Sequence, residues 1–92
     1  MENTAEKVAA VYAPERKLAA LRAIETGKVR WSFRTGLYSV RKGADVSTRD
    51  VDWACGHGYA AHFEHGRGYR VELTTLGAEW VSLLTERVAK QS

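Results

Sequence analysis

The sequence predicts a single α+β domain, because helical and strand-like patterns follow one another along a chain too short for two hydrophobic cores. The chain has 92 residues, of which 45% are hydrophobic and 27% are charged. This is the composition of a folded domain and not of a disordered tail. From the spacing of the apolar residues we expect an N-terminal helix, a β-hairpin, a short helix, a second β-hairpin and a C-terminal helix.

The first segment, 1–13, is predicted to form an N-terminal arm or short helix ahead of the main domain, 14–92. Val8, Val11 and Tyr12 give this segment one apolar side among charged residues and alanines. A helix this short is marginal by itself. The apolar side therefore needs a partner that covers it.

A helix is predicted over 14–26. Pro14 suits the first turn of a helix, where its missing N–H costs nothing. Apolar residues then recur at helical spacing, namely Leu18, Leu21 and Ile24. Gly27 can adopt the left-handed conformation that ends a helix.

The spacing of the apolar residues changes to two after this helix, which predicts a strand. Trp31 and Phe33 occupy one set of alternate positions and are expected to be buried. Arg30 and Arg34 occupy the other set and are expected on the outer face. A Thr-Gly turn then reverses the chain, and 37–40 completes a β-hairpin.

A short helix is predicted to begin near Ser47, whose hydroxyl can accept hydrogen bonds from the first free N–H groups. Asp50 stands three residues later and resembles the acid of a capping box. Gly56 and Gly58 make continuation costly, so the helix is expected to end there.

Alternation returns in 59–63 and 69–73, on either side of the glycine-rich turn 65–68. This pattern predicts a second β-hairpin with a basic tip. Thr74 or Thr75 is expected to cap the last helix. The apolar stripe of that helix consists of Leu76, Trp80, Leu83, Leu84 and Val88.

Positive charge is concentrated in residues 28–42, which contain no acid. Clustered Lys and Arg bind polyanions by releasing condensed counterions, so this stretch is a candidate phosphate-binding footprint. Edge strands also carry positive charge simply to prevent strand-to-strand association, and both explanations stay open. The basic residues of the stretch are Lys28, Arg30, Arg34, Arg41 and Lys42.

Metal and redox chemistry find little support in the sequence. Cys55 is the only cysteine, so an internal disulfide is excluded. His57, His62 and His65 follow it closely, but their spacing is not one of the common zinc patterns. We expect no metal and no cofactor.

Catalysis and membrane insertion are also disfavoured. Cys55 and His57 lack an evident third group that would orient a nucleophile and its base. The glycines of 56–61 follow a predicted helix, the reverse of the order in a dinucleotide-binding motif. No apolar stretch reaches the roughly 18–20 residues that span a bilayer, and the N-terminal residues do not resemble a signal peptide. We expect a non-enzymatic, cytoplasmic protein that does not bind membranes.

The order of these elements resembles a winged-helix domain. The likeness is clearest in Gly68-Tyr-Arg-Val-Glu-Leu-Thr-Thr-Leu-Gly-Ala-Glu-Trp80. This stretch is similar to the last wing strand and the Leu-Thr-x-x-Gly entry to the final helix of small bacterial regulators. The resemblance spans residues 14–88 and extends to short proteins of actinobacteria and actinophages.

The resemblance implies which residues would contact DNA. In winged-helix domains the helix before the wing enters the major groove, and the wing contacts phosphates or the minor groove. By position, the recognition helix would carry Thr48, Arg49, Asp52 and Trp53, and the wing would carry His65, Arg67 and Arg70. The first hairpin adds Arg30, Arg34, Arg41 and Lys42 as phosphate contacts.

The leading hypothesis is therefore a small phage or bacterial regulator that binds duplex DNA mainly through the phosphate backbone. The alternative is a protein-interaction module, such as a phage-encoded protein that binds and modulates a host protein through an acidic surface of that protein. Tyr12 and Trp53 would then be aromatic anchors. A homodimer through the terminal helices is a further expectation.

Overall fold

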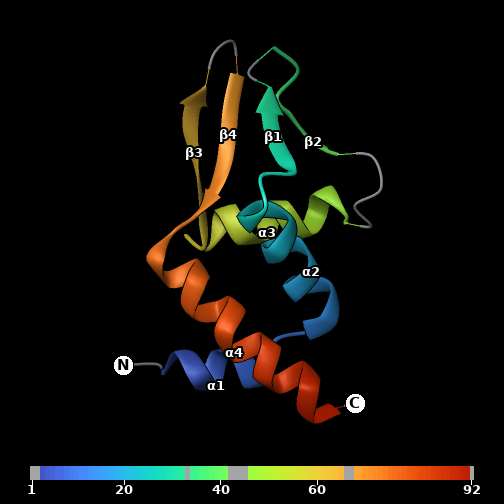
Figure 1. The fold of residues 1–92 in the computed structure, drawn as a ribbon, viewed down its shortest axis with the longest axis vertical. Helices are drawn as coiled ribbons and strands as arrows, with labels where there is room; N and C mark the ends of the chain where they lie inside the picture. The colour runs from blue at the N-terminus through green and yellow to red at the C-terminus, as the bar shows by residue number, and fades with distance from the viewer. Residues whose placement is uncertain (1–2, 33, 42–45, 66–67, 92) are drawn as a thin grey trace.

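The computed structural model describes residues 3–32, 34–41, 46–65 and 68–91, and the fold is α+β (Figure 1). These residues form four helices and a four-stranded antiparallel sheet, in the element order that the sequence predicts. The helices are α1 (Thr4–Ala10), α2 (Pro14–Glu25), α3 (Thr48–Gly56) and α4 (Thr75–Gln91). The strands are β1 (Val29–Ser32), β2 (Leu37–Val40), β3 (Ala60–His65) and β4 (Gly68–Leu73).

The two predicted hairpins join into one sheet with the strand order β2-β1-β4-β3. Strands β1 and β4 connect them by antiparallel pairing, with Arg30 opposite Arg70 and Trp31 opposite Tyr69. Figure 1 shows both hairpins projecting together from the end of the molecule that lies away from the two termini. Trp31 is half-buried, as alternation predicts, and Phe33 lies outside the described residues.

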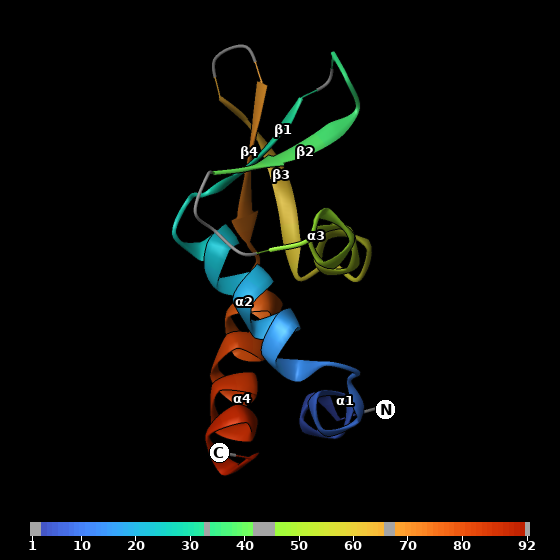
Figure 2. The ribbon, with the colours of Figure 1, turned by 90° about the vertical axis from the view of Figure 1, so that its right-hand side faces the viewer.

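The hydrophobic core lies where α2 and α4 meet the sheet (Figure 2). Leu21 of α2, Val71 of β4 and Leu84 of α4 are fully buried there. Helix α2 has the predicted ends, because Pro14 is its first residue and Gly27, at φ 75°, follows it in the left-handed conformation. Proline and glycine therefore determine where this helix begins and ends.

Helix α3 begins at the predicted cap. The Ser47 hydroxyl oxygen accepts a hydrogen bond from the Arg49 N–H at 3.2 Å. His57 follows the last helical residue, and its backbone N–H donates to the Trp53 carbonyl at 3.1 Å. The helix therefore ends between Gly56 and Gly58, as the sequence predicts.

The interpretation of Asp50 as a capping-box acid is wrong. Its side chain is buried and accepts hydrogen bonds from Lys17 at 2.7 Å and from Arg16 at 3.4 Å, both on α2. Asp50 and Val51 are both buried, so this part of α3 faces the interior. A buried carboxylate needs cationic partners, and Asp50 finds them on α2. This ion pair joins α3 to α2.

Helix α1 occupies part of the predicted N-terminal arm and packs against α4. Val8 is 3% exposed. The guanidinium of Arg87 on α4 donates hydrogen bonds to the carbonyl oxygens of Val8 and Val11 at 2.7 and 2.8 Å. Helix α4 of the same chain therefore covers Val8, whereas Tyr12 of the predicted apolar side is exposed.

Helix α4 is capped by Thr74, one of the two predicted candidates. Its hydroxyl oxygen accepts a hydrogen bond from the Gly77 N–H at 3.1 Å. Trp80 and Leu84 of the predicted stripe are buried, but Leu76 is exposed because Gly77 is the residue of that turn that packs inward. None of the described helices is both long and apolar enough to cross a membrane.

Candidate functional site

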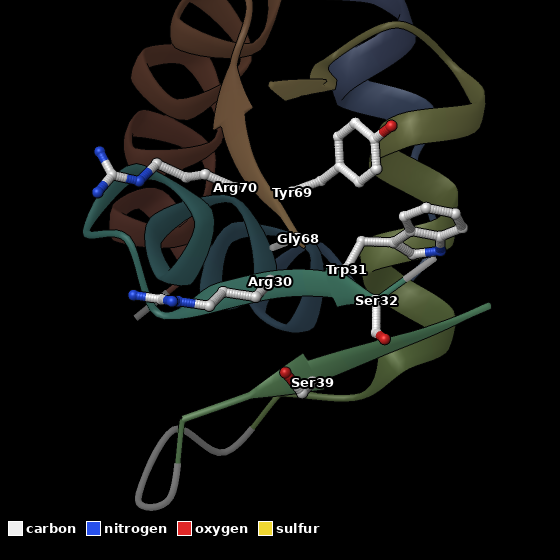
Figure 3. Close-up of a pocket in the computed structure, with 7 residues that line it drawn as sticks. All are labelled: Arg30, Trp31, Ser32, Ser39, Gly68, Tyr69 and Arg70. Carbon is white, nitrogen blue, oxygen red and sulfur yellow. The ribbon is translucent and has the colours of Figure 1, made fainter. Parts of the chain in front are cut away.

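The two faces of the sheet have different surroundings. Residues that pair across neighbouring antiparallel strands project to the same face, so the register divides the side chains into two sets. One face carries the fully buried Val29 and lies against the core. Figure 3 shows Trp31 and Tyr69 directed to that side, and Arg30 and Arg70 directed to the other. The arginines therefore belong to an open face.

Cations gather on this open face. Ser39 pairs with Arg30, and Arg30 pairs with Arg70 on the next strand. The Arg41 N–H donates to the Lys28 carbonyl at 2.8 Å, which extends the β1–β2 ladder by one more pair. We call this surface, made of Lys28, Arg30, Ser39, Arg41 and Arg70, the basic face.

Shallow hollows lie along the basic face. One, of about 420 Å³, is lined by Lys28, Arg30, Ser39 and Arg41 among others. The other, of about 270 Å³, is lined by Arg30, Ser39 and Arg70 among others (Figure 3). The hollows share Arg30 and Ser39, so they form one continuous surface.

The basic face is poorly neutralised. Arg30 and Arg70 stand directly opposite each other, an arrangement that destabilises a sheet. The Arg70 guanidinium lies 3.7 Å from the Glu72 carboxylate, but both side chains are 44–46% exposed, so the pair is weak. Among the described residues no carboxylate pairs with Lys28, Arg30 or Arg41.

The structure brings some of the predicted phosphate contacts together and separates others. Arg30, Arg41 and Arg70 meet on the basic face, although they come from both hairpins. Arg34 is exposed in the turn between β1 and β2, and His65 ends β3, paired with Gly68. Two of the predicted contacts, Lys42 and Arg67, lie outside the described residues.

The residues of the predicted recognition helix lie elsewhere. Thr48 and Arg49 are exposed at the start of α3. This helix packs against the opposite side of the sheet, next to Trp31 and Tyr69 (Figure 3). A ligand lying flat on the basic face would therefore not touch α3 at the same time.

The two predicted aromatic anchors have different environments. Trp53 is half-buried, and its ring packs against those of Tyr59 and Trp80, with centroids 5.1 and 5.5 Å away. Tyr12 is 82% exposed and precedes Ala13, which has a left-handed φ of 52°. Tyr12 is therefore displayed on the surface, whereas Trp53 belongs largely to the core.

Two residues of the open face were not among the site residues that the sequence predicts. Ser39 pairs with Arg30, and Phe63 of β3 pairs with Arg70. Both residues could have been found from the alternation of side chains along each hairpin, because a short turn fixes which residues of its two strands lie opposite each other. The pairing of β1 with β4, which aligns them in one row, has no local signal.

The opposite side of the sheet carries an aromatic cluster of Trp31, Tyr38 and His62. The Trp31 and His62 rings are stacked with centroids 5.2 Å apart, and the Tyr38 hydroxyl lies 2.9 Å from His62 Nε2. Burial raises the pKa of the nearby Cys55 thiol, and burial with a hydrogen bond to Cys55 raises that of Tyr38. Cys55 is therefore a protonated, weak nucleophile near neutral pH.

The described residues offer no metal centre, since no three His, Cys, Asp or Glu side chains among them gather in a way that could hold an ion. His57, which follows Cys55 after one glycine, stacks instead on Tyr59, with ring centroids 5.6 Å apart. The imidazole rings of His57 and His62 thus each stack on an aromatic ring, of Tyr59 and Trp31 respectively.

Comparison with known proteins gives no match for this chain. No family model, no curated protein and no solved structure matches it. What the protein binds must therefore be inferred from the geometry and charge of its own surface.

Proposed function

We propose that this protein binds nucleic acid through contacts between the basic face and backbone phosphates. The observation that carries the proposal is the placement of Arg30 directly opposite Arg70, beside the Lys28–Arg41 pair, on an open sheet face. Such a concentration of cations lowers the stability of the sheet when nothing is bound. A bound polyanion would offset this repulsion, because its negative charges attract both arginines.

Phosphate suits the chemistry of this face. Guanidinium groups make paired, charge-assisted hydrogen bonds to phosphate oxygens. The Ser39 hydroxyl lies in the same row as Arg30 and adds a neutral donor of the kind that often contacts phosphate. These contacts position a nucleic acid but do not read its sequence.

The duplex-DNA and winged-helix interpretations stay part of the proposal. They are supported by the order α2, β1, β2, α3, β3, β4 and by the position of β4 between β1 and β3. A helix-turn-helix unit needs two helices joined by a short turn, whereas α3 is the single helix among the described residues between β2 and β3. We therefore assign the main contact surface to the sheet.

The test is a salt titration with a labelled duplex of about 30 base pairs and a single strand of the same length. Arg30→Ala and Arg70→Ala should each make the negative slope of log K against log salt less steep, by roughly 0.9 for the duplex or 0.7 for the single strand per lost contact. Arg49→Ala is the matched control, because it removes an exposed arginine from α3.

Three results would contradict the proposal. The first is no binding of either oligonucleotide at low salt. The second is native affinity and slope in both sheet variants. The third is a loss in Arg49→Ala as large as the loss in Arg30→Ala, which would move the contact to α3.

A second candidate function is protein binding through Tyr12. A surface tyrosine next to a strained residue, Ala13, is a feature found at binding sites. A homodimer through the terminal helices also stays a proposal, and would use a hollow of about 290 Å³ between α1 and α4. A protein of this kind is expected to bind neither oligonucleotide in the titration.

A further inference from the structure

An exposed phenylalanine lies in the same row as the arginines of the basic face. Phe63 of β3 is 51% exposed. It pairs with Arg70 of β4, Arg70 pairs with Arg30 of β1, and Arg30 pairs with Ser39 of β2. Cross-strand partners share a face, so one row across the whole sheet presents a hydroxyl, two guanidinium groups and an aromatic ring.

The residues of this row are close neighbours in space. Neighbouring strands lie about 4.8 Å apart, so the backbone positions of Phe63 and Arg70 are separated by one such step. A base stacked on the Phe63 ring would carry its phosphate within reach of the long Arg70 side chain. The next phosphate along the nucleic acid would then approach Arg30.

We propose that the basic face takes a single nucleic-acid strand, with one base stacked on Phe63. The inference rests on the proposed nucleic-acid function and specifies its ligand. Stacking on an aromatic ring beside a track of cations is how proteins hold single strands without reading their sequence.

A duplex fits this face less well. Its bases are stacked on one another, so the Phe63 ring could reach a base only after a step had been unstacked, which costs free energy. A single strand presents the flat surfaces of its bases without this cost. Helix α3, the element expected to enter a major groove, lies on the other side of the sheet.

The experiment measures binding of three labelled probes at low salt. They are an oligothymidylate of about 12 nucleotides, an abasic strand of the same length, and a duplex of about 12 base pairs. Phe63→Ala and Phe63→Leu should weaken oligothymidylate binding by roughly 5- to 150-fold, the range observed when a stacking aromatic side chain is removed. Phe63→Tyr keeps the ring and should bind as the native protein does.

Two controls separate stacking from a general surface effect. Tyr12→Ala removes an exposed ring away from the sheet, and Leu37→Ala removes an exposed apolar side chain of β2. Both variants should retain native affinity within roughly twofold, far below the expected effect of removing a stacked ring. The abasic strand should bind Phe63→Ala and the native protein equally, since it has no base to stack.

The outcomes distinguish this inference from the broader proposal. If no probe binds, both fail. If oligothymidylate binds but Phe63→Ala has native affinity, or if the abasic strand loses as much, the phosphate contacts stand and the stacking role is overturned. Tighter binding of the duplex than of oligothymidylate would also overturn the single-strand inference.

Discussion

Gly77 shows how one residue can be fixed by a contact that lies far from it in the sequence. A Cβ atom at this position would overlap the carbonyl oxygen of Tyr59. The neighbouring Thr74 donates to the Gly58 carbonyl at 2.7 Å and accepts from the Gly77 N–H. The Leu-Thr-x-x-Gly stretch therefore fastens the start of α4 to the segment between α3 and β3.

We expect Gly77→Ala to destabilise the protein by several kcal/mol, because buried backbone cannot move aside as a flexible side chain does; overpacking alone typically costs ~1–3 kcal/mol. Gly56→Ala is the matched control. It lies in the last turn of α3 with open space around its Cβ direction, and replacing glycine by alanine in a helix favours folding by up to about 1 kcal/mol. Urea unfolding of both variants checks the prediction, and equal effects would contradict it.

Single residues were predictable from the sequence where the cause is local. Pro14, Gly27 and Ser47 act within one turn of a helix, and each has the predicted role. Asp50 also has a local pattern, but its side chain responds to Lys17 on another helix. An ion pair between distant segments outweighs a capping preference, and no local pattern contains it.

At the scale of elements, the contact between α3 and α2 contains a buried ion pair. Asp50 is 2% exposed, and its carboxylate forms an ion pair with the ammonium group of Lys17. The Lys17 side chain is itself mostly buried. The Lys17 ammonium also lies 5.2 Å from the centre of the Trp53 ring, a cation–π contact. This lysine therefore links α2 to both a charge and an aromatic ring of α3.

Lys17→Met should destabilise the protein by about 3–5 kcal/mol, because it leaves the buried Asp50 carboxylate without its closer cation. Arg16→Ala removes the more distant and more exposed partner of Asp50 and should cost about 1 kcal/mol or less. Chemical denaturation followed by tryptophan fluorescence measures both. Similar losses in the two variants would show that the buried pair does not anchor α3.

The elements themselves could be predicted, because each one repeats a pattern of period two or between three and four. How they combine could not. The pairing of β1 with β4 places Arg70 next to Arg30, and the packing of α4 on α1 buries Val8. Arg30, Arg41 and Arg70 could therefore be predicted as candidates, but the sequence also groups them with Arg49. Arg49 belongs to α3, the helix that packs on the other side of the sheet.

At the scale of the whole molecule, three groups among the described residues connect folding stability to alkaline pH. Burial raises the pKa of Cys55 above its ordinary value of 9.0, and burial raises the pKa values of Tyr38 and Tyr59 above 10.0. The folded state thus favours the protonated form of each group. Their contribution to stability is complete below the ordinary pKa values and is lost as the pH rises through the raised ones.

We therefore expect the free energy of unfolding to be insensitive to these groups up to about pH 8 and to fall above about pH 9. Tyr38→Phe removes one of the three groups and should make the alkaline loss smaller. Urea denaturation of the native protein and the variant, at several pH values from about pH 8 to about pH 10.5, checks this expectation. A free energy of unfolding that stays constant to the upper limit would refute it.

The sequence by itself determined the α+β class, the order of helices and strands, and several helix ends. These features depend on side-chain periodicity and on caps, which act over a few neighbouring residues. Tertiary structure alone decided that two hairpins share one sheet, that Asp50 turns inward, and that one open face collects Arg30, Arg70 and Phe63. The reason is that strand pairing and burial join segments distant in sequence, so their free energy depends on the packing of the whole chain.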